Sequence, residues 1–589
     1  MHSAQELHTR WPSLDTAARL ARLKKTLEIS PGPLAEIIRT HVDAAERAAM
    51  GLWRRQPSVW SADPAVQQTI ANRLGWLTSP VLMAESLDRL QTFAETVKRD
   101  GFTHVVLLGM GGSSLAPEVL RSVLGVRPGW PELHMLDSTD PAAVRAAVTP
   151  AAETLYLLAS KSGGTIEPNS LAAYFRSRLE EAGVPRWAGH FVAITDEDTS
   201  LARRARAEQF RDIFINPFDI GGRYSALSFF GLVPAALMGQ DLTALLGWGA
   251  AMLAACEPGG DIALNPAVAL GLVMGAAARA GRDKLTVLLP PELGAFGLWI
   301  EQLVAESTGK QGAGMIPIVG EAAASPAAYG SDRLFVCLRT RPNPADETGA
   351  LKAATLPVVT IELPELSAVG AEFVRWEVAT AIAGALLDVN PFDEPNVQQA
   401  KDATRVLLDQ YKAQGQLPMA RPDRTLTDGV TLTLSTAARQ QLAGSEAEAI
   451  LSLLRPGDYL AVLAFLGPDA DLAAPLDRFR IAVRDRTRAA TMFGYGPRYL
   501  HSTGQLHKGG PNTGVFLLIT ASPRFDLAIP GEAFSFGTLE LAQALGDFMS
   551  LDKAARRALH AHLTSPDPRL LQLLTATLLD RLPQRGTSA

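Results

Sequence analysis

Residues 104–125, HVVLLGMGGSSLAPEVLRSVLG, contain the pattern that decides the fold of this 589-residue chain. A short apolar run ends in a glycine-rich turn and is followed by helical spacing of apolar residues, which predicts a strand, a loop and a helix. The same sequence of patterns recurs downstream. Its apolar runs are ELHMLD (132–137), TLYLLAS (154–160), HFVAIT (190–195) and DIFIN (212–216). Strand–helix alternation at this spacing predicts βαβ units, with helices covering both faces of a parallel sheet.

The rest of the chain divides around this region. Residues 1–80 have helical spacing throughout, and a second strand–helix alternation has its strands at 284–290, 333–339 and 357–363. A third region contains the predicted strands VTLTL, YLAVLAFL, RIAVR and GVFLLIT and two predicted helices, 539–563 and 570–582. We therefore expect an α/β protein with two three-layer αβα sandwiches. The expected parts are a helical segment (1–80), two α/β domains (81–255 and 256–420) and a C-terminal α/β domain (421–589).

Composition excludes several classes of protein. The 47% of hydrophobic residues and 20% of charged residues argue against global disorder. A net charge of −6 gives no basic face for nucleic acid. Cys256 and Cys337 are too few for a disulfide framework or a four-cysteine zinc site. We find no signal-peptide or membrane-span pattern, so the sequence predicts a cytoplasmic protein without nucleic-acid or membrane partners.

The first glycine loop, GMGGSS, lies between a predicted strand and a predicted helix. Gly111, Gly112 and Ser113 would let backbone N–H groups approach an anion at the start of that helix. Three interpretations stay open: a phosphate or sugar site, a nucleotide site, or a purely structural turn. In a nucleotide site Asp137, at the end of the next strand, could bind the ribose, although Ser114 replaces the last glycine of the usual fingerprint.

The second loop, SKSGGT, also follows a predicted strand. Ser160, Ser162 and Thr165 supply hydroxyls and Lys161 a positive charge, a combination suited to a phosphate group. Its spacing differs from that of a nucleoside-triphosphate P-loop, and an ordinary serine–glycine turn is the alternative. Two such loops on neighbouring strands predict a shared crevice at the carboxyl edge of the sheet, of a size for a small sugar phosphate.

Further candidates lie outside these loops. In DIGGRYS a tight turn could direct Arg223 into a cleft, although a surface ion pair is the commoner use of such an arginine. In QLVAESTGK, Gln302 and Glu306 share a helix face, where burial could turn the glutamate into a general base; a solvent-facing glutamate is the alternative. Lys401 would ordinarily lie on an exposed helix face. The segment 500–514 adds two histidines better suited to acid–base work than to metal binding, His501 and His507.

Together these segments resemble the glucose-6-phosphate isomerase family of paired sugar-isomerase domains. The resemblance rests on GMGGSSLAPEV, SKSGGTIE, DIGGRYSALSFFG, QLVAESTGK and FDEPNVQQAK, which occur in the family's order. The last departs from the family's motif by having Asn396 and Gln398 in place of Gly and Glu. The C-terminal segment STGQLHKGG looks like a displaced form of the element that carries the family's ring-opening histidine. The likeness is strongest to the isomerase half of transaldolase–isomerase fusion proteins.

The resemblance implies conversion of glucose 6-phosphate to fructose 6-phosphate through an enediol, without a metal or organic cofactor. Ser160, Ser162 and Thr165 would hold the phosphate, and Lys401 with a histidine would open the ring. Glu306 would move the proton between C2 and C1, and Arg223 would stabilise the enediolate.

No histidine lies between Glu306 and Lys401, where the family has its ring-opening histidine. We therefore expect His507, ahead of His501, to reach the cleft from the third domain or from a neighbouring subunit, and a homodimer stays open. The rival functions are a phosphomannose or dual-specificity isomerase, a non-catalytic sugar-phosphate sensor and a nucleotide-dependent oxidoreductase.

Overall fold

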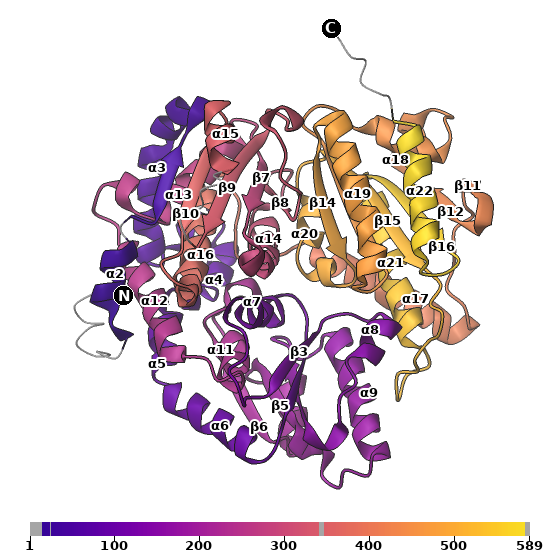
Figure 1. The fold of residues 1–589 in the computed structure, drawn as a ribbon, viewed down its shortest axis with the longest axis horizontal. Helices are drawn as coiled ribbons and strands as arrows, with labels where there is room; N and C mark the ends of the chain where they lie inside the picture. The colour runs from indigo at the N-terminus through magenta and orange to yellow at the C-terminus, as the bar shows by residue number, and fades with distance from the viewer. Residues whose placement is uncertain (1–13, 24, 341–346, 583–589) are drawn as a thin grey trace.

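The computed structural model describes residues 14–23, 25–340 and 347–582, and its strands form three sheets (Figure 1). The first sheet has the strand order β3-β2-β4-β5-β6, and all its neighbours are parallel. Its strands are β2 (His104–Gly109), β3 (Glu132–Leu136), β4 (Thr154–Ala159), β5 (Phe191–Asp196) and β6 (Asp212–Asn216). The five apolar runs predicted as strands are therefore confirmed.

Helices cover both faces of this sheet because β2 has apolar side chains on both sides. Val105 and Leu107 pack with α7 (Leu115–Leu124), whereas Val106 and Leu108 pack with α9 (Ile166–Glu181) on the other face. The other helices of this region are α6 (Leu87–Arg99), α8 (Pro141–Ala146), α10 (Ser200–Ala207) and α11 (Phe229–Leu237).

The second sheet has the order β1-β10-β9-β7-β8. Its parallel strands are β7 (Lys284–Leu288), β8 (Ile316–Val319), β9 (Arg333–Arg339) and β10 (Val358–Glu362). The helices of this part of the chain are α12 (Leu242–Ala255), α13 (Val268–Arg279), α14 (Gly294–Thr308), α15 (Glu347–Ala353) and α16 (Val369–Leu386). The next helix, α17 (Val397–Gln414), packs against α21 (Phe536–Lys553).

The predicted helical segment covers residues 1–80, of which 1–13 and 24 lie outside the described residues; among the others, the prediction is wrong at Leu27–Ser30. Residues Leu27–Ser30 form the strand β1, which pairs antiparallel with β10 at the edge of the second sheet. Leu27 and Ile29 alternate with polar residues, and both pack against the main core, so a period of two replaces the helical period here. The surrounding helices are α2 (Thr16–Leu23), α3 (Ala35–Trp53), α4 (Pro64–Ala71) and α5 (Ser79–Ala84).

The third sheet has the order β11-β12-β16-β15-β13-β14. Its strands are β11 (Arg424–Thr425), β12 (Thr431–Leu434), β13 (Tyr459–Phe465), β14 (Ala490–Tyr495), β15 (Gly514–Ala521) and β16 (Arg557–Leu563). The four strands β13 to β16 are parallel to one another, whereas β12 pairs antiparallel with β16 and with β11. Its helices are α18 (Thr436–Leu442), α19 (Ala470–Thr487), α20 (Gly504–Gly509), α21 (Phe536–Lys553) and α22 (Pro568–Asp580).

Two sequence predictions in this third region are wrong. The segment RIAVR, 480–484, lies inside α19, because Leu476, Phe479 and Val483 recur at helical spacing and bury one face. The end of the predicted helix 539–563 is instead β16, where Leu559 and Ala561 alternate into the core.

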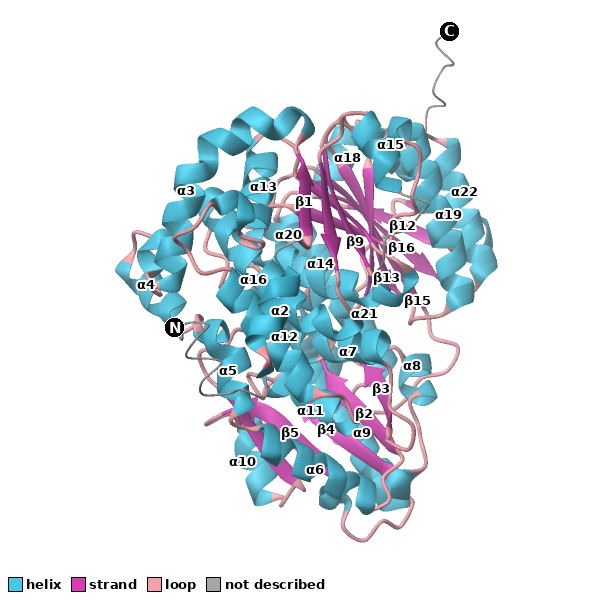
Figure 2. Ribbon diagram, turned by 60° about the vertical axis from the view of Figure 1, so that its left-hand side comes forward, coloured by secondary structure: helices cyan, strands magenta, loops and turns pink. Residues whose placement is uncertain are grey.

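The three sheets are joined by shared core packing. Leu407 of α17 and Phe536 of α21 lie in one apolar cluster with α9 of the first sheet, so the predicted domain boundaries remain a proposal. Figure 2 shows the first sheet below the other two, with α7, α14 and α21 between them. Within the described ranges, no helix combines the length and apolar character that crossing a membrane requires.

Candidate active site

A cavity of about 470 Å³ lies at the carboxyl edge of the first sheet, between α14, the start of α17 and a loop that follows β14. Open α/β sheets bind their ligands at this edge. Every predicted site residue except His507 lines this cavity: Gly111, Gly112, Ser113, Ser160, Lys161, Ser162, Thr165, Arg223, Gln302, Glu306, Lys401 and His501. The cavity thus brings together motifs that are almost 400 positions apart in the chain.

The SKSGGT loop presents hydroxyl groups and a helix N-terminus to the cavity. The hydroxyls of Ser160 and Thr165 lie 2.8 Å apart, and Ser162 is exposed. Thr165 immediately precedes α9, so the positive end of the helix dipole lies at the cavity wall. Lys161 forms an ion pair with Asp196, which holds the ammonium group at one side of the loop. This arrangement suits an anion such as phosphate.

The first glycine loop allows three parts of the site to approach one another. Gly111 has a φ of +55°, and a Cβ there would lie 2.7 Å from the carbonyl oxygen of His501. A Cβ on Gly112 would lie 2.0 Å from the carbonyl oxygen of Gly222, in the turn that carries Arg223. Glycine is therefore required at both positions by close backbone approach.

Arg223 lies in a one-turn 3-10 helix and is only 4% exposed, so the alternative of a surface ion pair is wrong. Its Nη1 lies 3.3 Å from Glu306 Oε1. Its other contacts are Nε to Ser307 Oγ (2.7 Å), Nη1 to Glu394 Oε2 (3.0 Å), and Nη2 to the carbonyl oxygens of Pro391 (2.7 Å) and Asp393 (2.9 Å). The guanidinium donors are thus directed to fixed acceptors. Burial opposes the charge, but the two carboxylates raise the pKa of Arg223 above its ordinary value.

Glu306 is a buried carboxylate near the end of α14. Gln302, one turn earlier, donates from Nε2 to Glu306 Oε2 at 3.1 Å. Burial raises the pKa of Glu306 above its ordinary value; the charge of Arg223 opposes this rise, and the nearby negative charge of Glu394 adds to it. The alternative of a solvent-facing glutamate is therefore wrong. A buried carboxylate with a raised pKa, fixed beside an arginine, can act as a general base.

His501 forms a hydrogen bond with a residue that sequence reasoning missed. Its Nε2 lies 2.7 Å from Glu167 Oε1, which also accepts from Gln543 Nε2 at 2.7 Å. Burial would raise the pKa of Glu167, but His501 and Lys401 among others leave it below its ordinary value. Because an ionised carboxylate only accepts, Nε2 of His501 carries a proton and Nδ1 is left as the basic nitrogen. Glu167 is the last residue of SKSGGTIE, and its place in that motif was the available signal.

The expectation that His507 reaches the cleft is wrong. His507 is 1% exposed, and its ring packs 5.2 Å from Phe516 and 5.9 Å from Tyr499 inside the third sheet's core. Within the described residues, neither ring nitrogen has a hydrogen-bond partner. Burial, together with the charges of Lys508 and Arg556, lowers its pKa well below the ordinary value, so the ring is neutral.

The loop that carries His501 is anchored at several points on the other two sheets. Arg498 forms a bidentate ion pair with Asp137, at 2.7 and 2.8 Å, which leaves no role for Asp137 as a ribose ligand. Gln302 Nε2 donates to the His501 carbonyl oxygen at 2.8 Å. Gln505 Nε2 donates to the carbonyl oxygen of Gly309 at 3.0 Å. The histidine is thus positioned by this same chain.

A family model and several curated proteins match parts of this chain. Residues 81–321 match the model of the phosphoglucose isomerase family. The glucose-6-phosphate isomerase of Trichormus variabilis is 29% identical over 449 residues, covering 64% of this chain and 82% of that protein. The same enzyme of Thermosynechococcus vestitus is 32% identical over 354 residues, covering 52% of this chain and 66% of that protein. A solved structure of a hypothetical protein from Thermus thermophilus has a TM-score of 0.54 at 25% identity, covering 64% of this chain and 99% of that chain.

Proposed function

Because the chain belongs to the phosphoglucose isomerase family, we propose that it interconverts D-glucose 6-phosphate and D-fructose 6-phosphate by proton transfer through an enediol. The observation that carries this proposal is the placement of Glu306 in the cavity. The buried carboxylate lies beside Arg223 and shares the cavity with the SKSGGT loop and with the His501–Glu167 pair. An anion site, a base and a second proton-transfer pair are the groups that this reaction needs.

The substrate phosphate binds at the SKSGGT loop in this proposal. Ser160, Ser162 and Thr165 donate hydroxyl hydrogen bonds, and the N-terminus of α9 favours negative charge. Lys161 contributes at longer range, because Asp196 already holds its ammonium group.

Ring opening requires a proton to leave the anomeric hydroxyl and another to reach the ring oxygen. His501 Nδ1 is the acceptor in our proposal, and Glu167 stabilises the imidazolium that forms, because the two side chains lie 2.7 Å apart. Lys401 lines the same cavity, and in our proposal its ammonium group gives a proton to the ring oxygen as the C1–O5 bond breaks and His501 takes the proton of the anomeric hydroxyl.

Isomerisation then moves one proton between C2 and C1, while a hydroxyl proton passes between the neighbouring oxygens O2 and O1. Glu306 removes the proton from one carbon and returns it to the other, and negative charge develops on the enediolate oxygen meanwhile. Since the donors of Arg223 are directed to protein acceptors, it acts on this charge mainly through its fixed positive field. The ion pair with Arg223 also favours the ionised form of Glu306.

Isotope exchange tests the assignment of the base. Glu306→Gln should abolish exchange of the C2 proton with solvent, whereas binding of the sugar phosphate stays measurable by calorimetry. Glu301→Gln, on the same helix but outside the cavity lining, is the matched control. Normal exchange in Glu306→Gln would remove Glu306 from the mechanism. Running both sugars, glucose 6-phosphate and mannose 6-phosphate, in the same assay decides between the two aldose specificities.

His501 comes from the same chain as Glu306 and Arg223, and this part of the proposal can be tested separately. All the groups named above lie on one chain, so we propose that turnover needs no residue from a second copy. The turnover rate per chain should stay constant when the protein is diluted through the concentration range in which a dimer would dissociate. A rate that falls on dilution, together with a change in molecular mass, would contradict this part and leave the assignment of Glu306 untouched.

A further inference from the structure

A second cluster of polar side chains lies at the other end of the first sheet. His104 is the first residue of β2, and Glu132 is the first residue of β3. The two are partners in the parallel ladder, and His134, two positions further along β3, is on the same face. One ligand atom from each of the three residues lies within 4.8 Å of the others. The sugar-phosphate cavity, by contrast, lies at the carboxyl ends of these strands.

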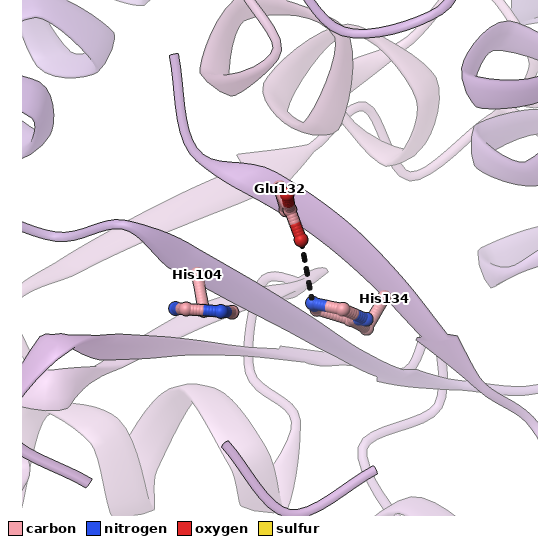
Figure 3. Close-up of side chains that lie close together, drawn as sticks. All are labelled: His104, Glu132 and His134. Atoms are coloured by element: carbon pink, nitrogen blue, oxygen red, sulfur yellow. Dashed lines mark ion pairs between the residues drawn. The ribbon is translucent and has the colours of Figure 1, made fainter. Parts of the chain in front are cut away.

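The arrangement in Figure 3 suits convergence on one point. The rings of His104 and His134 are 5.5 Å apart with planes inclined by only 14°, and they are seen edge on, side by side. The Glu132 carboxylate points toward Nε2 of His134 (Figure 3). An ion bound between the two ring edges would lie near both ring planes, where the nitrogen lone pairs point.

The neighbours of His104 determine which of its nitrogens is free. Thr103 Oγ1 donates to Glu153 Oε2 at 2.8 Å, because a carboxylate can only accept. The hydroxyl has one proton, so it must accept from His104 Nδ1, which lies 2.8 Å away. His104 therefore carries its proton on Nδ1, and Nε2 keeps a lone pair for a metal. Outer hydrogen bonds of this kind orient the imidazole ligands of metal sites.

His134 has a buried nitrogen without a hydrogen-bond partner. Its Nε2 is inaccessible to solvent and makes no hydrogen bond to any described residue. The nearest carboxylate oxygen, Glu132 Oε2, is 3.8 Å away, which is too long for a hydrogen bond. A buried polar atom left without a partner is costly, and a cation at this point would satisfy it.

We propose that His104, Glu132 and His134 form a binding site for a zinc-type divalent cation. Two imidazole nitrogens and one carboxylate oxygen are a usual zinc donor set, and water would complete a tetrahedron. Tetrahedral zinc requires ligand atoms about 3.3 Å apart, so the exposed Glu132 and the rings must rotate inward. The ion would fasten the edge strand β3 to β2. The other end of β3 leads to Asp137, the partner of Arg498, so the site would also stiffen the anchor of the His501 loop.

Zinc titration of the full-length chain after chelator treatment tests this inference without using turnover. Calorimetry should find one equivalent of Zn²⁺ that is lost in His134→Ala, and Co²⁺ should give a tetrahedral visible spectrum that is lost with it. Thr103→Val should weaken binding about 10- to 100-fold by releasing the ring of His104. His41→Ala, on the distant helix α3, and His501→Ala should both keep this equivalent.

The thermal midpoint should rise with Zn²⁺ in the wild type and not in His134→Ala. Zinc binding that is equal in the wild type and His134→Ala, or no saturable binding at all, would overturn the inference. Because these readouts are stoichiometry, spectrum and melting, failure of the proposed isomerase function would leave them unchanged.

Discussion

Glu394 is the carboxylate that competes with Glu306 for Arg223, and its replacement tests the electrostatics of the base directly. Both carboxylates contact Nη1 of Arg223, at 3.0 Å and 3.3 Å. Glu306 works only when ionised, and the negative charge of Glu394 disfavours that ionisation. Glu394→Gln removes this charge and keeps the side chain's shape. The pKa of Glu306 should therefore fall, and the acid limb of the kcat/KM profile should move to lower pH.

The size of the shift follows from the geometry. Two carboxylates that share one nitrogen lie roughly 5 Å apart, and at an effective dielectric of about 20 they repel by about 3 kcal/mol. The Glu394 side chain is 44% exposed, so solvent screening reduces this repulsion to about 1.4 kcal/mol, which corresponds to about a tenfold change in an equilibrium. On the acid limb the ionised fraction of Glu306 limits the rate, so kcat/KM there should rise about tenfold.

The assay is a coupled measurement of kcat/KM between pH 5 and 9, at constant ionic strength. Glu197→Gln is the matched control, because Glu197 also lines the cavity but pairs with Arg206 rather than with Arg223. The control should leave the acid limb in place. An acid limb that stays fixed or moves to higher pH in Glu394→Gln would refute the electrostatic reasoning, whatever happens to the maximal rate.

Three further predictions concern the elements around the base. His501→Ala should slow the anomerisation of fructose 6-phosphate, followed by NMR, more than it slows C2 proton exchange of the open-chain sugar. His507→Ala should lower the thermal midpoint without this selective loss of ring opening. The opposite pattern would restore His507 as the ring-opening residue. Gly112→Ala forces a Cβ to 2.0 Å from the carbonyl oxygen of Gly222, in the turn that carries Arg223. The clash should displace Arg223 and lower turnover by about 100-fold. A crystal structure of the variant with Arg223 in its original place would contradict this prediction. Arg498→Met leaves Asp137 buried without its cation, so the free energy of unfolding, measured with denaturant, should fall by about 3 kcal/mol and ring opening should slow. A fall below about 0.5 kcal/mol would mean that the ion pair contributes little to stability.

Local patterns in the sequence were enough to predict the first sheet and most of the residues that line the cavity. The run HVVLLG followed by glycines predicts a strand and an anion-binding loop, because strand period and turn chemistry are local properties. The choice between His501 and His507 was beyond such reasoning. The two histidines lie in one glycine-rich segment, and only the packing of α20 against Phe516 determines which one is buried.

Other errors have a similar origin. Leu27 and Ile29 form a strand because β10 has an unpaired edge with which they can form backbone hydrogen bonds. This partner is distant in the sequence, so no local pattern predicts it. The end of the predicted helix 539–563 is a strand because β15 and β12 lie on either side of it. Glu167 belongs to the motif SKSGGTIE, but no local pattern indicates its role, because its partner His501 lies 334 positions away.

The hydrogen bond from Gln302 to the carbonyl oxygen of His501 ties the loop after β14 to the helix that carries the base. Any fluctuation that moves this loop away from α14 also removes His501 from the sugar site. Because the ligand binds only the closed site, bound ligand opposes this opening of the loop. A competitive inhibitor at about one hundred times its Kd stabilises the closed loop by about 2.7 kcal/mol, which should slow amide hydrogen exchange there about 100-fold. The protection should reach α20, which contains no cavity-lining residue. Amide exchange rates beside the third sheet would then depend on whether ligand occupies a site that is formed mostly by residues around the other two sheets.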